Sequence, residues 1–295
     1  MFINFGHKGF SEDDIEEMLE PPGRRQITNE WEYIRSPMRE GQDHCLTVPF
    51  PPLKMAFDEA FPNIKQTGWR DGTNHTYYTY LNEVTEGELN AIEAYFKKIV
   101  GCVAIRDCLP ISFAIDFDRY TGNPTNDPTE IGEIRRKAKP YGGQPVNDSH
   151  YKAADELVNK VVEFIKRVRF YNELVSIVGM PPSDPNKDFI LTEYLASKVS
   201  KVLKMEDLSN LVKKKYRTGE TKNLPLNKKL NSIRGSISVS ADVDGQKILL
   251  LDDLYQSGIT TNYVAMLLLE QGAAKVYSLS CEKTCKNDDN IQGNQ

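Results

Sequence analysis

An uninterrupted apolar run, KILLL at residues 247–251, constrains the fold of this chain more than any other segment. A strand that is apolar at almost every position is typical of a parallel sheet covered by helices on both faces. Before it, amphipathic helices are predicted at 151–168 and 189–204, with a short apolar strand at 174–180 between them. A helix that begins at Thr260 and a last strand, KVYSLSC, follow it. Strands and helices that alternate in this way predict an α/β fold built on a doubly wound, mostly parallel sheet.

The first hundred or so residues have a different pattern, rich in Pro, Gly and charged residues, with few long periodic segments. The clearest element there is a helix at about 86–99, for which Thr85 is the expected N-cap. We therefore expect an N-terminal α+β accessory region of unknown role, a main domain and a polar tail without fixed structure. Their expected bounds are 1–105, 106–285 and 286–295.

Composition excludes several classes of protein. The 37 basic and 42 acidic residues give a net charge of -5, which excludes a globally basic nucleic-acid coat but not a local basic patch. No run approaches the roughly 20 apolar residues that a membrane helix needs, and the first residues lack the pattern of a secretion signal. The five cysteines contain no CxxC pair, so a disulfide framework or a zinc ribbon is not expected. These features predict a cytoplasmic protein without membrane contact.

The string LLLDDLYQSGIT places polar groups at the end of the apolar strand. Asp252 and Asp253 stand at its carboxyl end, where α/β folds bind ligands, and carboxylates there suit sugar hydroxyls or a magnesium ion. Gly258 allows a tight turn around a phosphate, and Ser257 and Thr260 have hydroxyls that can donate to its oxygens. The backbone N–H groups that open the next helix add an anion site. The alternative is an ordinary turn followed by an ordinary capped helix, but the complete string is much rarer than its parts.

This string resembles the phosphoribosyl-pyrophosphate (PRPP) signature of type I phosphoribosyltransferases, and the layout around it resembles the ComF-like branch of that family. The resemblance covers about 110–285 and includes TEIGEIRRKAKPYG at 129–142, which is similar to the family's early helix. It implies that Asp252 and Asp253 hold the ribose 2- and 3-hydroxyls and the magnesium ion. It also implies a cradle for the 5-phosphate made of Gln256, Ser257, Gly258, Ile259 and Thr260.

The same resemblance implies where pyrophosphate binds. The turn after the strand at 174–180 lies where such enzymes place their pyrophosphate loop, and it consists of Met180, Pro181, Pro182 and Ser183. The basic, turn-rich segment at 213–235 lies where the family has a mobile flap, and its Lys215 and Arg217 would neutralise the leaving group. A plain loop and a solvated charged hairpin are the respective alternatives.

The implied reaction is magnesium-dependent displacement of pyrophosphate from C1 of PRPP by a nitrogen acceptor, which needs positioning and electrostatics rather than a nucleophilic side chain. The chain departs from the family pattern at 187–190, where it reads KDFI, and at Gln256, where many transferases carry an acidic residue. Two alternatives stay open: an inactive module that senses PRPP or a nucleotide, and a ComF-like accessory protein in DNA handling. Expected partners are PRPP or another phosphorylated ribose, a protein bound through the N-terminal region, and a second copy in a homodimer. Nucleic acid is weakly supported, and the residues leave the acceptor open.

Overall fold

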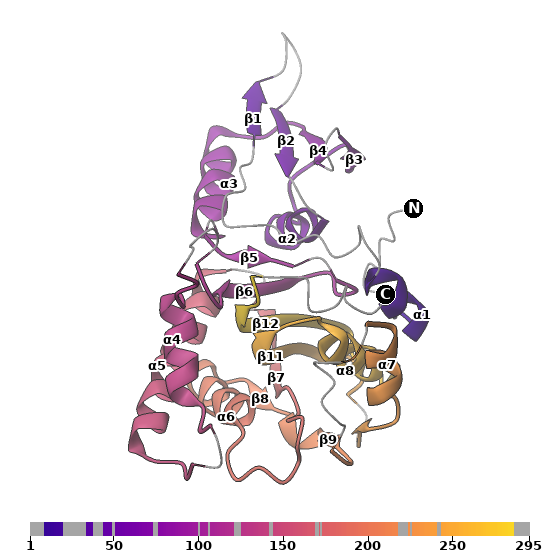
Figure 1. The fold of residues 1–295 in the computed structure, drawn as a ribbon. Coiled ribbons are helices and arrows are strands. Elements are labelled where there is room, and N and C mark those ends of the chain that lie inside the picture. The colour runs from indigo at the N-terminus through magenta and orange to yellow at the C-terminus, as the bar shows by residue number, and fades with distance from the viewer. Residues whose placement is uncertain are drawn as a thin grey trace.

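A computed structural model gives the fold of the chain (Figure 1). It describes residues 9–19, 34–37, 44–48, 51–72, 76–99, 101–105, 107–120, 125–141, 144–168, 171, 173–217, 224, 226–240 and 243–285. The predicted tail at 286–295 and part of the predicted flap, 218–223, lie outside these residues.

A six-stranded sheet with the order β5-β6-β12-β11-β7-β8 forms the centre of the molecule. Only the pairing of β5 with β6 is antiparallel; all other neighbours in this sheet are parallel. The sequence prediction of a doubly wound, mostly parallel α/β sheet is thus confirmed. The strands are β5 (Val103–Ala104), β6 (Ser112–Phe117), β7 (Ser176–Gly179), β8 (Glu206–Asp207), β11 (Lys247–Tyr255) and β12 (Lys275–Lys283).

Helices cover both faces of this sheet, as the apolar run in β11 predicted. Leu249 and Leu251 belong to the core on one face, and Ile248 and Leu250 to the core on the other. The first face carries α4 (Glu130–Ala138), α5 (Asp148–Arg167) and α6 (Leu191–Leu203). The second face carries α1 (Glu12–Leu19), α7 (Leu226–Ile233) and α8 (Ile259–Glu270).

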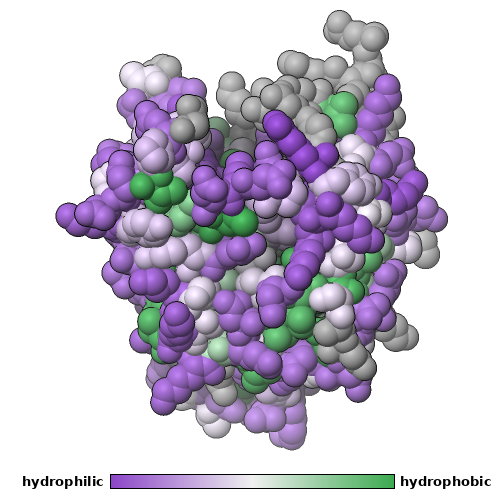
Figure 2. Space-filling view, turned by 90° about the horizontal axis from the view of Figure 1, so that it is seen from below, coloured by the Kyte–Doolittle hydropathy of each residue, from purple (hydrophilic) through white to green (hydrophobic). Residues whose placement is uncertain are grey.

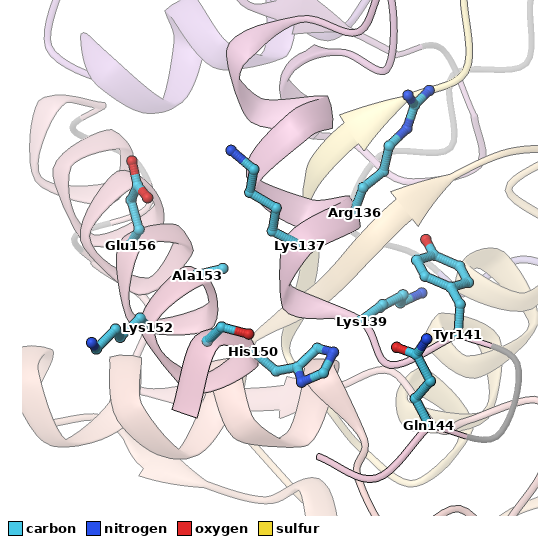
Figure 3. A pocket seen from close by; sticks show the side chains of 10 residues that line it. Arg136, Lys137, Lys139, Tyr141, Gln144, His150, Lys152, Ala153 and Glu156 are labelled. Carbon is cyan, nitrogen blue, oxygen red and sulfur yellow. The ribbon is translucent and has the colours of Figure 1, made fainter. Parts of the chain in front are cut away.

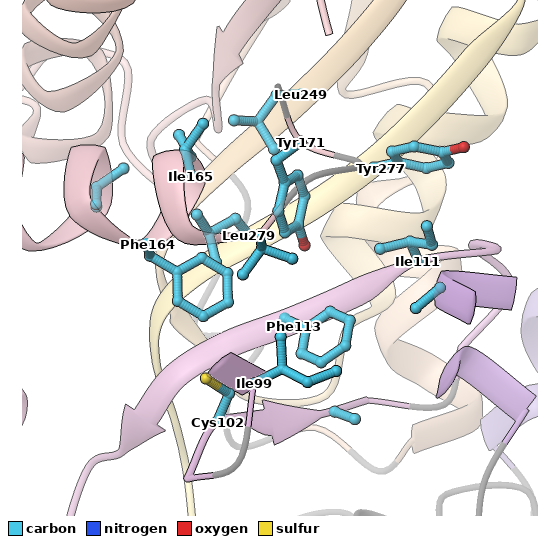
Figure 4. Packing of buried hydrophobic residues seen from close by; sticks show 14 of the residues in the cluster. Ile99, Cys102, Ile111, Phe113, Phe164, Ile165, Tyr171, Leu249, Tyr277 and Leu279 are labelled. Carbon is cyan, nitrogen blue, oxygen red and sulfur yellow. The ribbon is translucent and has the colours of Figure 1, made fainter. Parts of the chain in front are cut away.

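The core between the sheet and α5 is rich in aromatic rings (Figure 4). Phe113 of β6 packs against Phe164 of α5, with ring centroids 6.4 Å apart, and both contact Tyr171. The Tyr171 hydroxyl donates to the Ser278 carbonyl at 2.5 Å. The polar end of this fully buried ring is therefore bonded to the central strand β12.

The N-terminal region is α+β, as expected, and packs on the same core. It contains a four-stranded antiparallel sheet with the order β1-β2-β4-β3. Its elements are β1 (Ile34–Pro37), β2 (His44–Val48), α2 (Pro51–Ala60), β3 (Arg70–Asp71), β4 (Tyr77–Leu81) and α3 (Glu86–Ile99). Phe57 of α2 and Phe96 of α3 are fully buried in one cluster with Phe113. The expected N-cap is present, since the Thr85 hydroxyl accepts from the Glu88 N–H at 3.2 Å.

The basic segment between β8 and β11 contains more regular structure than its sequence indicated. A short 3-10 turn (Ser209–Leu211) leads into β9 (Val212–Lys214), which pairs antiparallel with β10 (Ile237–Val239). Helix α7 lies between these strands, although the sequence predicted only turns there. The reason is tertiary, because Leu230 and Ile233 of α7 are buried against the face that α8 covers.

The outer surface is largely polar. Seen from below the view of Figure 1, hydrophilic residues dominate and the hydrophobic ones form small separate patches (Figure 2). Among the helices that the structure describes, none is both long enough and apolar enough to span a bilayer.

Candidate functional site

The order of the strands places a topological switch point between β7 and β11. From β7 the chain passes through α6 to β8 on one side, whereas from β11 it passes through α8 to β12 on the other. In open α/β sheets, ligands bind at such a switch point, outside the carboxyl ends of the strands. The Met180 N–H donates to the Leu251 carbonyl at 2.9 Å, so the predicted pyrophosphate turn lies beside the predicted ribose carboxylates.

The two adjacent aspartates at the end of β11 have different surroundings. Asp253 is buried and bonded by two cations of the α4 segment: Lys139 forms an ion pair with it, and Arg135 Nη1 lies 3.3 Å from its Oδ2. Arg135 also pairs through Nε with Glu282, which is fully buried in β12. Asp252 is half-buried, and its Oδ1 accepts from the Asp253 N–H at 2.8 Å. Asp252 is therefore the carboxylate that these cations leave open toward a ligand.

These surroundings move the two pKa values in opposite directions. Burial and the adjacent charge of Asp253 raise the pKa of Asp252. Burial alone would raise the pKa of Asp253 as well, but the charges of Lys139 and Arg135 outweigh it and lower that pKa. Burial also raises the pKa of Glu282 to about 7, although Arg135 opposes the shift. Asp253 is the group of this cluster that most firmly holds a negative charge.

Helix α4 can bring its cations to the sheet because it approaches β6 very closely. Its N-cap Thr129 donates through the hydroxyl to the Phe117 carbonyl at 2.5 Å and accepts from the Gly132 N–H at 3.1 Å. A Cβ at Gly132 would overlap the Asp118 carbonyl oxygen, so only glycine allows this distance. Arg135 lies in the last turn of α4 and Lys139 is its C-cap, so both cations reach Asp253 from the end of this helix.

The predicted phosphate loop lies between β11 and α8 and is braced from beneath. Gly258 has φ +78°, and a Cβ there would overlap the hydroxyl of the buried Tyr255. That hydroxyl donates to Asp107 Oδ2 at 2.9 Å. Asn262 of α8 donates to the Gly258 carbonyl at 2.8 Å and accepts from the Cys108 N–H at 3.0 Å. The loop is thus fixed by groups from two segments that lie about 150 residues apart in the sequence.

The open side of this loop presents donors. Within the described residues, no group accepts a hydrogen bond from the backbone N–H groups at the start of α8, Ile259 and Thr260. Ser257 and Thr260 are half-buried, and no described group bonds to the Ser257 hydroxyl. Free N–H groups and hydroxyls at a helix N-terminus can bind an anion. The structure thus brings four of the five predicted cradle residues, Ser257 to Thr260, to one place, with Gln256 directly before them.

The predicted pyrophosphate turn is fixed at its first residues. Gly179 lies against α6 so closely that a Cβ would overlap the Thr192 carbonyl, and the Thr192 hydroxyl donates to the Met180 carbonyl at 2.6 Å. Met180 is buried, whereas Pro181 and Pro182 are half-buried and Ser183 is exposed. The predicted flap contacts the end of this turn, since Arg217 Nε lies 3.7 Å from Asp184 Oδ2. Lys215 is exposed, and its backbone N–H donates to the Ser236 carbonyl at 2.7 Å.

The residues fit a magnesium ion only together with a ligand. No group of three or more His, Cys, Asp or Glu side chains suited to a metal occurs within the described ranges. Of the predicted ligands, Asp253 already carries two cations and Asp252 is half-buried at the edge of the sheet. Mg²⁺ is commonly bound by one or two carboxylates with substrate phosphates and water. This pair therefore suits an ion that arrives with a diphosphate.

Three contributors to the site were missed in the sequence: Arg135, Lys139 and Asp107. Arg135 and Lys139 lie inside the segment that resembled the family's early helix, and their four-residue spacing was the available signal. Asp107 carries no local signal, because its partner Tyr255 is 148 residues away.

Comparison with known proteins places this site in a family context. Residues 193–286, about a third of the chain, match the phosphoribosyl transferase domain family. No curated protein matches the chain. Among solved structures, the chain is similar to phosphoribosylpyrophosphate synthetase from Mycobacterium smegmatis, with 15% identity over 77% of this chain and 78% of that chain. The TM-score of 0.27 is too low to support an argument about the fold. The segment that carries Asp252, Asp253 and the Gly258 loop thus has the sequence pattern of a phosphoribosyl transferase domain.

Proposed function

We propose that this protein binds PRPP and transfers its phosphoribosyl group to a nitrogen acceptor, with release of pyrophosphate. One observation carries the proposal: the aspartate pair, the Gly258 loop and the Met180 turn meet at the switch point between β7 and β11. The family match over 193–286 supports a PRPP ligand. The ComF-like branch, a cytoplasmic location and a homodimer belong to the same proposal and rest on the sequence alone.

Each part of PRPP has a matching group at this switch point. The 5-phosphate would accept from the N–H groups and hydroxyls of Ser257 to Thr260, where the dipole of α8 favours negative charge. Asp252 would accept the ribose hydroxyls, while Asp253 keeps Arg135 and Lys139 in place. The diphosphate would lie over the Met180 turn. Lys215 and Arg217 follow the end of β9, and their exposed side chains would move to contact the diphosphate. Asp252 would help to hold a magnesium ion, which would supply positive charge to neutralise the leaving group.

The chain would contribute mainly position and charge. Binding of the 5-phosphate, far from the reacting carbon, can hold the ribose in the geometry that the acceptor needs. The half-buried carboxylate of Asp252 places negative charge near a sugar that becomes positive as the bond to pyrophosphate breaks. No residue of the proposed site has to form a covalent bond with the substrate.

Calorimetric titration with PRPP, with and without Mg²⁺, tests this proposal. The wild-type protein should bind PRPP saturably, and Asp252→Asn should weaken binding at least tenfold. Asp13→Asn, which removes an exposed carboxylate on α1, is the matched control and should leave binding unchanged. Release of pyrophosphate in the presence of a panel of nitrogen bases then tests transfer. A folded wild-type protein that binds no PRPP under either condition would overturn the proposal.

A second candidate is a PRPP-binding module without turnover. It is favoured by the two cations on Asp253, which reduce the negative charge available at the ribose, and by Gln256 at a position that is often acidic in the family. Saturable binding of PRPP without pyrophosphate release for any base would favour this candidate. Salt-dependent binding of DNA would instead favour a role in DNA handling through the basic hairpin.

A further inference from the structure

A pocket of about 460 Å³ lies between the end of α4 and the start of α5 (Figure 3). Most of its lining residues carry polar or charged side chains, and Ala153 is its one small apolar residue. It is lined by Arg136, Lys137, Lys139, Tyr141, Gln144, Ser149, His150, Lys152, Ala153 and Glu156. Four cationic side chains against one carboxylate give this pocket a positive potential.

Much of that charge is not neutralised locally. Within the described residues, Arg136 and Lys152 have no ion-pair partner. They extend in opposite directions, away from each other and from the ring of His150 (Figure 3). Lys137 pairs with Glu133 at 2.7 Å, on the exposed surface of α4. Such a pocket attracts anions.

His150 adds a directed donor. This side chain belongs to a residue that is only 7% exposed, and its ring extends from the start of α5 toward Lys139 and Gln144 (Figure 3). Its Nδ1 accepts from the Asn147 N–H at 3.1 Å, as part of the capping box of α5. In the neutral ring the proton is then on Nε2, for which the described residues offer no acceptor. This N–H lies in the lining of the pocket together with Lys139 and can donate to an oxyanion.

The pocket adjoins the proposed ribose site through Lys139, which lines the pocket and forms an ion pair with Asp253. An anion in the pocket would share this ammonium group with Asp253. We infer that the pocket binds the acidic group, carboxylate or phosphate, of the molecule that accepts the phosphoribosyl group. This inference rests on the proposed function. The acceptor would then be an acidic nitrogen compound rather than a neutral base, and its remaining part would extend toward Asp252.

The NMR ring signal of His150 reports directly on anion binding in the pocket. It is identified by its loss in the His150→Gln variant. Inorganic phosphate should move this signal saturably, both in the wild-type protein and in Gly258→Ala, which alters the separate phosphate loop. Acetate, titrated in a second experiment, distinguishes a carboxylate from a phosphate preference. If neither phosphate nor acetate moves the His150 signal, the inference is wrong.

Variants at the same position sharpen the test. His150 is the third residue of α5, where Glu and Gln both preserve a capping box. His150→Glu should retain the helix but weaken binding of the probe anion at least tenfold through charge repulsion, whereas His150→Gln keeps an N–H donor and should weaken it less. Equal binding by the two variants contradicts the inference.

Addition of PRPP separates the inference from the proposed function. If PRPP binds and the phosphate-induced shift of His150 persists, the pocket is distinct from the PRPP site, as expected. If PRPP displaces the probe from His150, the pocket belongs to the PRPP site and the acceptor assignment is wrong. If PRPP does not bind at all, the proposed function fails, and the acceptor assignment fails with it even where the His150 shift is observed.

Discussion

At the scale of single residues, Tyr255 connects the buried core to the candidate phosphate loop. Its ring packs with Val103, Ile105 and Phe117, and its hydroxyl fills the space that a side chain at Gly258 would need. Asp107 accepts a hydrogen bond from the Tyr255 hydroxyl and so keeps the ring in place. The shape of the loop is therefore set from below by residues that no ligand touches.

Gly258→Ala should abolish binding of PRPP and lower the free energy of unfolding by roughly 3 kcal/mol, because its Cβ meets Tyr255 and its backbone is left-handed. Gly245→Ala is the matched control, since Gly245 has φ +70° but open space around it. The control should cost about 1 kcal/mol, from the backbone alone, and bind PRPP normally. Calorimetry and chemical denaturation of both variants measure the difference. Equal losses in the two variants would show that contact with Tyr255 is unimportant.

Asp107 predicts a specific pH dependence of stability. Burial raises its pKa from 3.8 in an unfolded chain to about 6, so the folded state holds this proton more tightly. Asp107 therefore stabilises the folded state most below pH 4. This contribution to the free energy of unfolding, about 3 kcal/mol, is lost as the pH rises through 6. Asp107→Asn should remove this part of the decline in the free energy of unfolding between pH 4 and pH 7, measured by denaturation at each pH. Asp13→Asn should leave the decline intact, and an unchanged profile in Asp107→Asn would contradict the assignment.

At the scale of secondary-structure elements, α4 determines which charges reach the sheet. The helix lies across the carboxyl ends of β6, β12 and β11, held by Thr129 at its start and by the ion pairs of Arg135 and Lys139 toward its end. Gly132 sets its distance from β6. A shift of this one helix would move both cations away from Asp253 together.

Gly132→Ala should therefore lower the free energy of unfolding by about 2 kcal/mol or more and weaken PRPP binding, because α4 must move away from the Asp118 carbonyl. Gly87→Ala in α3 makes the same change in a helix with room for a Cβ, and should stabilise by about 0.5–1 kcal/mol. Thermal denaturation and PRPP titration of the two variants give the comparison. A neutral Gly132→Ala would contradict the close approach of α4.

Sequence alone predicted those elements whose signal is local. The helix at 86–99 matches α3 residue for residue, and the apolar run at 247–251 begins β11 as expected. Helix α7 was missed because its eight residues are mostly polar and lie in a basic, turn-rich segment, and it buries its apolar residues against α1 and α8. Strands β5 and β8 have two residues each, too few for any periodic pattern.

The same distinction holds at the candidate site. The aspartate pair and Gly258 form one continuous string, so their proximity follows from the sequence. Arg135 is 118 residues from Asp253, and only the fold brings the two together. The opposite pKa shifts of Asp252 and Asp253 depend on that contact, and no local pattern could have predicted them.

At the scale of the whole molecule, the N-terminal region and the sheet share one hydrophobic core. The rings of Phe57 and Phe96 stack with centroids 6.4 Å apart, and both residues belong to the cluster that contains Phe113 of β6. Lys275 of β12 also bonds to Glu59 of α2 at 2.7 Å. The expected boundary at 105/106 thus falls inside a continuous set of contacts, immediately after β5 joins the main sheet.

This continuity predicts that the molecule unfolds in a single transition. Phe96→Ala should lower the free energy of unfolding by about 3–5 kcal/mol, because it leaves a cavity in the shared core. Differential scanning calorimetry should show one peak in both proteins, shifted as a whole by the substitution. Two peaks, of which the substitution moves only the first, would mean that residues 1–105 unfold separately.

The position of β12 has a consequence for how the chain is made. Within the described residues this strand is the last element, yet it pairs on both sides, with β6 and β11, in the middle of the sheet. A nascent chain that ends before Lys275 exposes two long, unpaired strand edges, which favour aggregation. Folding of the sheet must therefore wait until β12 has been synthesised. A chain that stops before β12 also lacks Glu282, so we expect it to be degraded as unfolded material rather than to act as a smaller functional protein.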